Sequence, residues 1–266
     1  MKITKYFLET DKQGIDVKIA CVADLHARNP QKALSALKTI SPDVILLAGD
    51  IMEVANKYMA KRNKNAISFL QKASQIAPCF YCFGNHEIYF SHAIKKINRV
   101  PDTKMQREYL SYIEKLGIRL INDCFEEFHI ENNEKLLIGG VVCGKDKNME
   151  KYEKEIDAKF LKKYDENDKF KILLCHYPHY YEKYLKNTNF DLILSGHAHG
   201  GQWRFFGQGL YAPHQGLLPK YTSGIFDGRF IISKGATNNA KPIPRLFNSP
   251  EVLEINVKSE ERVKQP

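Results

Sequence analysis

The stretch Val17-Lys-Ile-Ala-Cys-Val-Ala-Asp24-Leu-His26 decides how the fold begins, because an apolar, β-branched run leads directly into an aspartate and a histidine. Runs of this composition predict buried strands. Similar runs recur along the chain, and the predicted strands are Val17–Ala23, Val44–Leu47, Cys79–Phe83, Lys135–Val142, Lys171–Cys175, Leu192–Leu194, Phe230–Ser233 and Val252–Ile255.

Between several of these strands, apolar residues recur at helical spacing. The predicted helices are Gln31–Ile40, Ala66–Ile76, Lys104–Leu116 and Met149–Tyr164. Strand and helix therefore alternate in the first half of the chain, whereas the last strands follow one another without long helices. This order predicts an α/β sandwich of two mixed β-sheets. The 266 residues, 43% of them hydrophobic, are enough for one sizeable core, so we expect residues 1–266 to form a single domain.

The charge balance is basic, with 40 Lys and Arg residues against 31 Asp and Glu residues. Such a surface attracts phosphate-bearing partners and anionic membranes without choosing between them. No apolar run is long enough to cross a bilayer, and the first twenty residues lack the apolar block of a secretory signal. We therefore expect a cytoplasmic location, with peripheral contact to anionic lipid at the inner membrane face left open.

The six cysteines are expected to be reduced and mostly structural, because the sequence shows no secretory signal. Cys79 and Cys82 have the CxxC spacing of a redox or zinc motif. They fall within a predicted strand, however, where positions three apart face opposite sides of the sheet. The strand context therefore argues against both kinds of motif.

Polar side chains gather directly after the predicted strands, and such positions meet at one edge of an α/β sheet. They are Asp24, His26, Asp50, Asn85, His86, His176, His197 and His199. Carboxylate, imidazole and amide oxygen together suit borderline divalent metals such as zinc, manganese or iron. Gly49, Gly84 and Gly196 each precede a candidate ligand, where a sharp turn after a strand favours glycine. The pattern predicts a metal site that two adjacent ions could share.

These clusters follow a recognisable order: D-x-H at Asp24, GD at Asp50, GNHE at Asn85, a lone His176, and GHAHGGQ from Gly196. The order resembles the calcineurin-like metallophosphoesterase superfamily, and the GHxHGGQ ending resembles its bacterial phosphodiesterase-like branch. The resemblance implies a four-layer α/β/β/α sandwich and a hydrolase of phosphate esters. It does not extend to the serine/threonine phosphoprotein phosphatases, which carry an arginine-rich stretch after the GD block.

The resemblance also implies a role for each candidate residue. Two divalent metal ions are expected, Mn²⁺ first, with Fe, Zn or Ni as alternatives. The first ion would be held by Asp24, His26 and His199, the second by Asn85, His176 and His197, and both by Asp50. A metal-bridging hydroxide would attack a phosphodiester or phosphomonoester, small or lipid-linked, while His86 protonates the leaving group and Glu87 orients the His86 ring.

Three further features allow two interpretations each. Arg28 and Asn29, just after His26, either bind the substrate phosphate or belong to a solvated loop. The basic residues Lys57, Lys61, Arg62 and Lys64 form either an electropositive approach to the site or a solvated face. The apolar loop that begins at Trp203 either contacts a lipid chain or nucleobase, or packs on the core of the domain.

Two other functions compete with a phosphoesterase. The basic charge suggests a metal-dependent nuclease or nucleic-acid-binding protein, although the sequence contains no helix-turn-helix or zinc-finger pattern. A silent scaffold that keeps metals for structure is the other, and the intact Asp50 and His86 argue against it. The sequence indicates a phosphate ester as the partner, and no obligatory nucleic-acid or protein partner.

Overall fold

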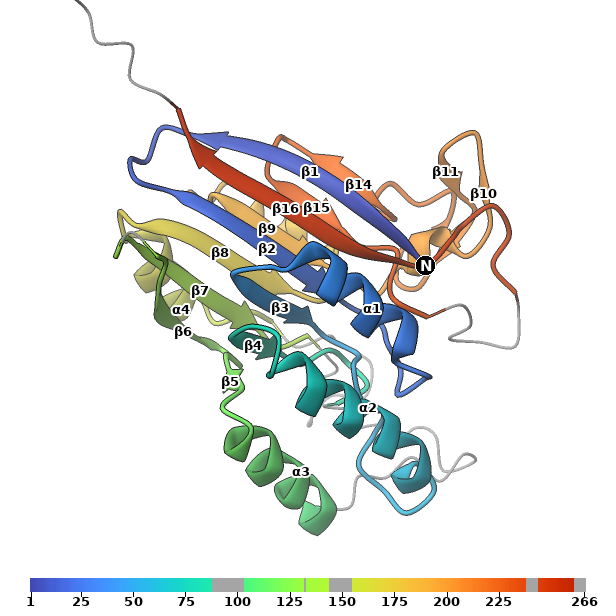
Figure 1. The fold of residues 1–266 in the computed structure, drawn as a ribbon. Helices are drawn as coiled ribbons and strands as arrows, with labels where there is room; N and C mark the ends of the chain where they lie inside the picture. Colours follow the sequence, from blue (N-terminus) through green and yellow to red (C-terminus); the bar gives the residue numbers. More distant parts are fainter. Residues whose placement is uncertain (88–102, 132, 144–154, 238–243, 261–266) are drawn as a thin grey trace, which may run out of the picture.

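The computed structural model describes residues 1–87, 103–131, 133–143, 155–237 and 244–260, and Figure 1 shows its fold. The first of two six-stranded sheets has the order β1-β16-β2-β3-β4-β5. β2, β3 and β4 are parallel, so their carboxyl ends reach the same edge of the sheet. The bounds are β1 Lys2–Thr10, β16 Glu251–Ser259, β2 Asp16–Val22, β3 Val44–Ala48, β4 Cys79–Cys82 and β5 Arg119–Leu120.

The second sheet has the order β14-β15-β9-β8-β7-β6, and its strands β7, β8, β9 and β15 are parallel. The bounds are β14 Gly224–Phe226, β15 Phe230–Ile232, β9 Leu192–Ser195, β8 Phe170–Cys175, β7 Lys135–Val141 and β6 Cys124–His129. Two small hairpins lie between β9 and β14. They are β10 (Arg204–Phe205) with β11 (Gln208–Gly209), and β12 (Tyr211–Ala212) with β13 (Gly216–Leu217).

The two sheets pack face to face, and the alternation along β2 shows why. Ile19 and Cys21 belong to the core between the sheets, where they join residues such as Ile172 on β8 and Leu194 on β9. Ala20 and Val22 point to the opposite face and pack against helices. Because successive side chains of a strand face opposite sides, one apolar run can supply two layers of core.

Helices cover the outer face of each sheet. α1 (Gln31–Ile40), α2 (Ala60–Ala73) and α3 (Thr103–Lys115) contribute to the core on the first sheet, as Figure 1 shows for α1 and α2. α4 (Ala158–Asp165) and the π-helical segment Tyr181–Leu185 contribute to the core on the second sheet. The layers are therefore α/β/β/α, which confirms the predicted sandwich of two mixed sheets flanked by helices.

The structure differs from the prediction at several elements. β1 was not predicted, because its charged and apolar residues are interleaved as suits a half-exposed edge strand, and β6 and β14 were also missed. α2 begins at Ala60, earlier than the expected Ala66. The helix expected over Met149–Tyr164 begins only at Ala158, because Asp157 caps it by accepting the Lys159 amide hydrogen bond at 2.8 Å. Residues 149–154 lie outside the described ranges.

Cys79 and Cys82 face opposite sides of the first sheet, as their position in a predicted strand implies. Cys79 packs in the core under the helices, and Cys82 packs in the core between the sheets. All six cysteines are free thiols. Among the described residues, no helix has both the length and the apolar character needed to cross a membrane.

Candidate metal centre

Five loops bring the candidate ligands to one place. Each loop follows the carboxyl end of a parallel strand: β2, β3 and β4 in the first sheet, β8 and β9 in the second. The loops carry, in this order, Asp24 with His26, Asp50, Asn85 with His86, His176, and His197 with His199. The site therefore lies where the edges of both sheets meet, so residues from Asp24 to His199 become neighbours.

Local backbone geometry turns these side chains inward. Asp24, His26, Asp50, His197 and His199 all have positive φ, between 49° and 66°. Residues other than glycine rarely adopt this left-handed conformation, and such strain concentrates at functional sites. Ten other described residues besides glycine also have positive φ, so this backbone geometry accompanies the candidate site and does not by itself mark it as functional.

The first donor cluster consists of Asp24, His26 and His199, whose ligand atoms all lie within 4.8 Å of one another. Nε2 of His26 is 3.2 Å from Nε2 of His199 and 3.8 Å from Oδ1 of Asp24. Both oxygens of Asp24 accept a hydrogen bond from the His197 amide at 3.0 Å. This contact ties the loop after β2 to the loop after β9.

The second cluster consists of Asp50, His176 and His197, again within 4.8 Å. Nδ1 of His176 donates to the carbonyl of Ala48 at 2.7 Å, which leaves Nε2 facing Asp50 Oδ2 at 3.1 Å. This orientation is typical of histidines that bind metals. Oδ1 of Asn85 and Nε2 of His197 are buried without a hydrogen-bond partner among the described residues. Such orphaned donor atoms fit a bound cation, so the two clusters suit divalent metal binding.

Charges within the site are strongly coupled. Burial opposes the ionisation of Asp50, but the His176 and His86 rings outweigh it and hold the pKa of Asp50 well below its usual value. In the same way burial lowers the pKa of His176, while Asp50 outweighs this effect and raises that pKa to about 10. Burial and neighbouring cationic groups lower the pKa of His197 and of His199. These last two rings are therefore neutral, the form that can bind a metal.

His86 lies at the rim of the site, with 25% of its side chain exposed and Nε2 3.9 Å from Oδ2 of Asp50. Its Nδ1 lies 2.8 Å from Oε2 of Glu53, a buried carboxylate that the sequence interpretation missed. Burial alone would lower the pKa of His86, but Asp50 and Glu53 raise it to about 9. The signal available in the sequence was the spacing Gly49-Asp50-x-x-Glu53, which places a second carboxylate three residues after the first.

Glu87 has a different role from the one expected. Its carboxylate accepts hydrogen bonds from the amides of Asp50, Met52 and Gly84, at 2.9 to 3.0 Å, and from the Tyr81 hydroxyl at 2.5 Å. Glu53 contacts the His86 ring instead. Glu87 thus fixes the loops after β3 and β4 relative to each other, and supports the site through their backbone.

Gly49, Gly84 and Gly196, which precede candidate ligands, are needed mainly because a side chain at these positions would collide with neighbouring residues. Gly49 has φ of +87°, and a Cβ there would lie 2.5 Å from Nδ1 of His176. Gly84 and Gly196 have no positive φ, contrary to the sharp turns expected, but added Cβ atoms would collide with Asp50 and Asp24 respectively. The close approach of neighbouring loops, more than turn geometry, therefore explains these two positions.

The structure places the remaining residues of interest near the two clusters as follows. Arg28 and Asn29 line a pocket beside the site, and the Asn29 carboxamide also accepts the Gln31 amide at the start of α1. Arg245, which the sequence interpretation did not single out, places Nη2 3.2 Å from Nδ1 of His199. In the loop after Trp203, Ala212 is buried, whereas Phe206 is fully exposed, so only part of this loop packs on the core.

Comparisons with known proteins agree with this geometry. A family model described as "Calcineurin-like phosphoesterase" matches residues 17–201. An uncharacterized metallophosphoesterase from Aquifex aeolicus is 26% identical, over 97% of this chain and 92% of the relative. The UDP-2,3-diacylglucosamine pyrophosphatase LpxG from Chlamydia muridarum is 25% identical, over 89% of this chain and 82% of the relative.

A solved structure shares the fold. It is a Staphylococcus aureus protein described as a 5'-nucleotidase in complex with alpha-ketoglutarate, which aligns with a TM-score of 0.50 at 11% identity. The alignment covers 95% of this chain and 56% of that one. At this identity the likeness concerns the arrangement of the two sheets alone.

Proposed function

This chain belongs to the calcineurin-like phosphoesterase family, and from that premise we propose that it is a dinuclear, metal-dependent phosphoesterase. Three donor groups meet in the site, and the proposal rests on two of them, Asp24–His26–His199 and Asp50–His176–His197. The third, His26–Glu53–His86, shares His26 with the first. In this proposal Asp50 would serve both ions, because a carboxylate has two oxygens that can bind cations. Asn85 completes the second set through its buried Oδ1.

The chemistry divides between the ions and the chain. Bound divalent ions would supply positive charge for the phosphoryl oxygens and an acidified water as the nucleophile. His86 is the proposed general acid: 25% of its side chain is exposed, and Nε2 is the nitrogen that lies 3.9 Å from Oδ2 of Asp50. Glu53 at Nδ1 favours the protonated ring, so that Nε2 carries a proton to give to the leaving oxygen.

We take residues 1–266 as one catalytic domain. The family match ends at residue 201, yet β14 and β15 extend the second sheet, and β16 lies between β1 and β2 in the first. Ala236 donates its amide hydrogen bond to the carbonyl of Ala23, beside Asp24. A chain cut after residue 201 would therefore lose an internal strand of the first sheet and part of the support for the metal centre.

The substrate is proposed to be a small or lipid-linked phosphate ester. The similarity to a pyrophosphatase of UDP-2,3-diacylglucosamine favours a substrate that joins a polar phosphate to an apolar part. The exposed side chains of Phe206, Leu217 and Phe247 would suit such an apolar part. Hydrolysis of nucleic acid is the second candidate, supported by the net charge of +9.

The experiment is a substrate panel with manganese, iron, zinc, nickel and magnesium supplied separately to chelator-treated protein. The panel holds phosphodiesters, phosphomonoesters, nucleotide sugars, glycerophospholipids and single-stranded DNA. We expect turnover of at least one small phosphate ester, with manganese the strongest activator. Absence of turnover with every metal, in a protein whose fold is intact, would refute the proposal that this protein is a phosphoesterase. A preference for DNA over the small esters would favour the nuclease function.

A further inference from the structure

A row of histidine rings leads from the second donor cluster to the surface. The ring centroid of His197 lies 5.2 Å from that of His176 and 5.3 Å from that of His214. The His214 ring also stacks on the ring of His179, with centroids 5.1 Å apart and planes 17° apart. His176 and His197 are buried, whereas His214 is exposed. His214 is therefore the point at which a ligand from solvent can contact this row.

Packing and hydrogen bonds hold the His214 ring in place. Tyr177, in the loop after β8, has its ring centroid 5.1 Å from that of His214 and 4.4 Å from that of His197. His214 lies in the turn between β12 and β13, and the next residue, Gln215, fastens that turn. Its side-chain nitrogen donates to the Tyr221 carbonyl at 2.8 Å, and its side-chain oxygen accepts from the Tyr221 amide at 2.9 Å. The ring is thus positioned beside His197, unlike a side chain on a loosely held surface loop.

The row meets the first donor cluster at the Asp50 carboxylate. Oδ2 of Asp50 lies 3.1 Å from Nε2 of His176, in the row, and 3.8 Å from Nε2 of His26, in the first cluster. The His26 ring in turn contacts the ring of His86, with centroids 4.5 Å apart, and 25% of the His86 side chain is exposed. Two sets of rings therefore share Asp50, and each set includes one residue that reaches solvent, His86 in the first and His214 in the second.

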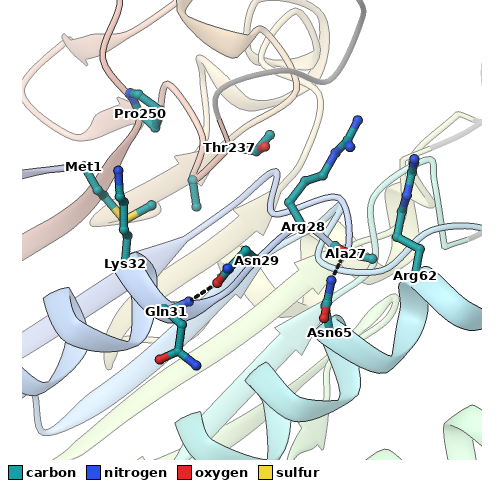
Figure 2. A pocket seen from close by; sticks show the side chains of 11 residues that line it. Met1, Ala27, Arg28, Asn29, Gln31, Lys32, Arg62, Asn65, Thr237 and Pro250 are labelled. Carbon is teal, nitrogen blue, oxygen red and sulfur yellow. Dashed lines mark hydrogen bonds between the residues drawn. The ribbon is translucent and has the colours of Figure 1, made fainter.

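The cations of the pocket beside α1 do not form a comparable contact point. Figure 2 shows Lys32 at the opposite end of this pocket from Arg28 and Arg62, so the three side chains do not converge on one group. Arg62 is also paired with Glu53, its Nη1 lying 3.7 Å from Oε1. A ring already packed against a proposed ligand is thus better placed than these cations to contact a group held in the metal centre.

We propose that His214 is a substrate-binding residue whose ring donates a hydrogen bond to a phosphoryl oxygen, on the side of the site opposite His86. The inference rests on the proposed phosphoesterase function, because the metal centre must hold that phosphoryl group. An imidazole carries an N–H donor in its neutral form as well as in its protonated form, so the contact requires no change of protonation. His214 thus steadies the phosphoryl group from one side, while His86 serves the leaving oxygen from the other.

The first measurement is the affinity of the manganese-loaded protein for inorganic phosphate, determined by calorimetry, which requires no turnover. His214→Phe keeps a planar ring that can pack on His197 but removes both ring nitrogens. We expect the Kd of phosphate to rise about tenfold in this variant, because a hydrogen bond to a charged oxygen is lost. His214→Gln retains an N–H donor and should recover most of the affinity.

The second measurement is kcat/KM for the p-nitrophenyl ester of thymidine 5'-monophosphate, at constant pH and saturating manganese. This leaving group needs little protonation, so the acid role of His86 has little influence on the result. We expect His214→Phe to lower kcat/KM about tenfold. The Kd of manganese, titrated separately, should equal that of wild type, because His214 contacts the substrate and is not a ligand.

The matched control is His129→Phe. His129 is an exposed histidine on β6 that pairs with Lys135 at the start of β7, the end of the strand away from the metal centre. This variant should leave the Kd of phosphate, kcat/KM and the Kd of manganese at their wild-type values. Thermal unfolding of each variant checks that the fold is retained, and His214→Ala replaces His214→Phe if the phenylalanine variant does not fold.

The outcomes separate the inference from the function on which it rests. If wild type hydrolyses no ester with any metal, the phosphoesterase function fails and the role of His214 fails with it. If wild type hydrolyses the ester and His214→Phe matches it in phosphate affinity and in kcat/KM, the contact is wrong while the phosphoesterase stands. If His214→Phe instead weakens manganese binding, and saturating manganese restores phosphate affinity and turnover, His214 only shields His197 and the proposal is overturned.

Discussion

Replacement of Glu53 by glutamine should move the pH dependence of catalysis without removing the metal ligands. Glu53 Oε2 lies 2.8 Å from Nδ1 of His86, and only 8% of the Glu53 side chain is exposed. Glutamine keeps the size of the side chain and an oxygen acceptor but loses the negative charge. The charge stabilises the protonated ring, so its loss lowers the pKa of His86.

The size of this shift follows from the contact. A hydrogen bond to a charged group contributes roughly 1.5–3 kcal/mol, and one pKa unit corresponds to about 1.36 kcal/mol. Because the His86 side chain is 25% exposed, solvent screening favours the lower end of this range. The pKa of His86, about 9 with Glu53 present, should therefore fall by about one unit in Glu53→Gln. An acid that must be protonated loses activity as pH rises through its pKa, so the alkaline limb moves to lower pH.

The assay is kcat/KM against pH at saturating metal, on a phosphodiester whose leaving group is an alkyl alcohol. A p-nitrophenyl ester serves as the internal control, because its leaving group needs little protonation and should show little of the shift. Glu126→Gln, an exposed carboxylate on β6, is the matched control variant. An alkaline limb at the same pH in wild type and Glu53→Gln, on the alkyl ester, would falsify the role assigned to the Glu53–His86 pair.

Three further predictions follow from the same structure. Asp50→Asn should reduce turnover at least a hundredfold with an unchanged circular dichroism spectrum; near-wild-type turnover would exclude the bridging role. Chelation should abolish turnover, and readdition of metal at about 100 times its Kd should restore it and add about 2.7 kcal/mol per bound ion to the free energy of unfolding. A metal-dependent melting temperature without any turnover would favour the silent scaffold. Leu194→Ala, in the core between the sheets, should lower the free energy of unfolding by about 2–5 kcal/mol in urea titrations, and a loss below 1 kcal/mol would mean that this core is loosely packed.

The sequence predicted the fold wherever a strand is buried on both faces. β3 is a continuous apolar run, and β2 and β8 are apolar apart from Asp16, Lys18 and Lys171, because both sides of each sheet are covered. Their composition therefore identifies them. β1 is different: it lies at the edge of the first sheet, and residues such as Phe7 are exposed while charged residues alternate with apolar ones. Its identity depends on pairing with β16, which is nearly 250 residues away and leaves no local signal.

The candidate site was predictable from the sequence where its residues follow buried strands. Proposed ligands such as Asp24 and Asp50 follow buried strands, and parallel strands bring their carboxyl ends to one edge. Glu53 was not predictable in this way. Its spacing places a second carboxylate three residues after Asp50, but its importance arises from a contact between two loops, in which the Glu53 carboxylate meets the His86 ring. Short-range spacing alone does not show such a contact.

The left-handed backbone at the ligands shows what holds the site in shape. A non-glycine residue in this conformation costs on the order of 1–3 kcal/mol, and Asp24, Asp50 and His197 all adopt it. Buried hydrogen bonds accompany this conformation: the His197 amide donates to Asp24, and the Asp50 amide donates to Glu87. Carboxylates that are not ligands in our proposal, Glu53 and Glu87, thus hold the loops and rings that present the ligands. The strain and its supports together indicate a site whose donor geometry is set by the folded protein before any cation binds.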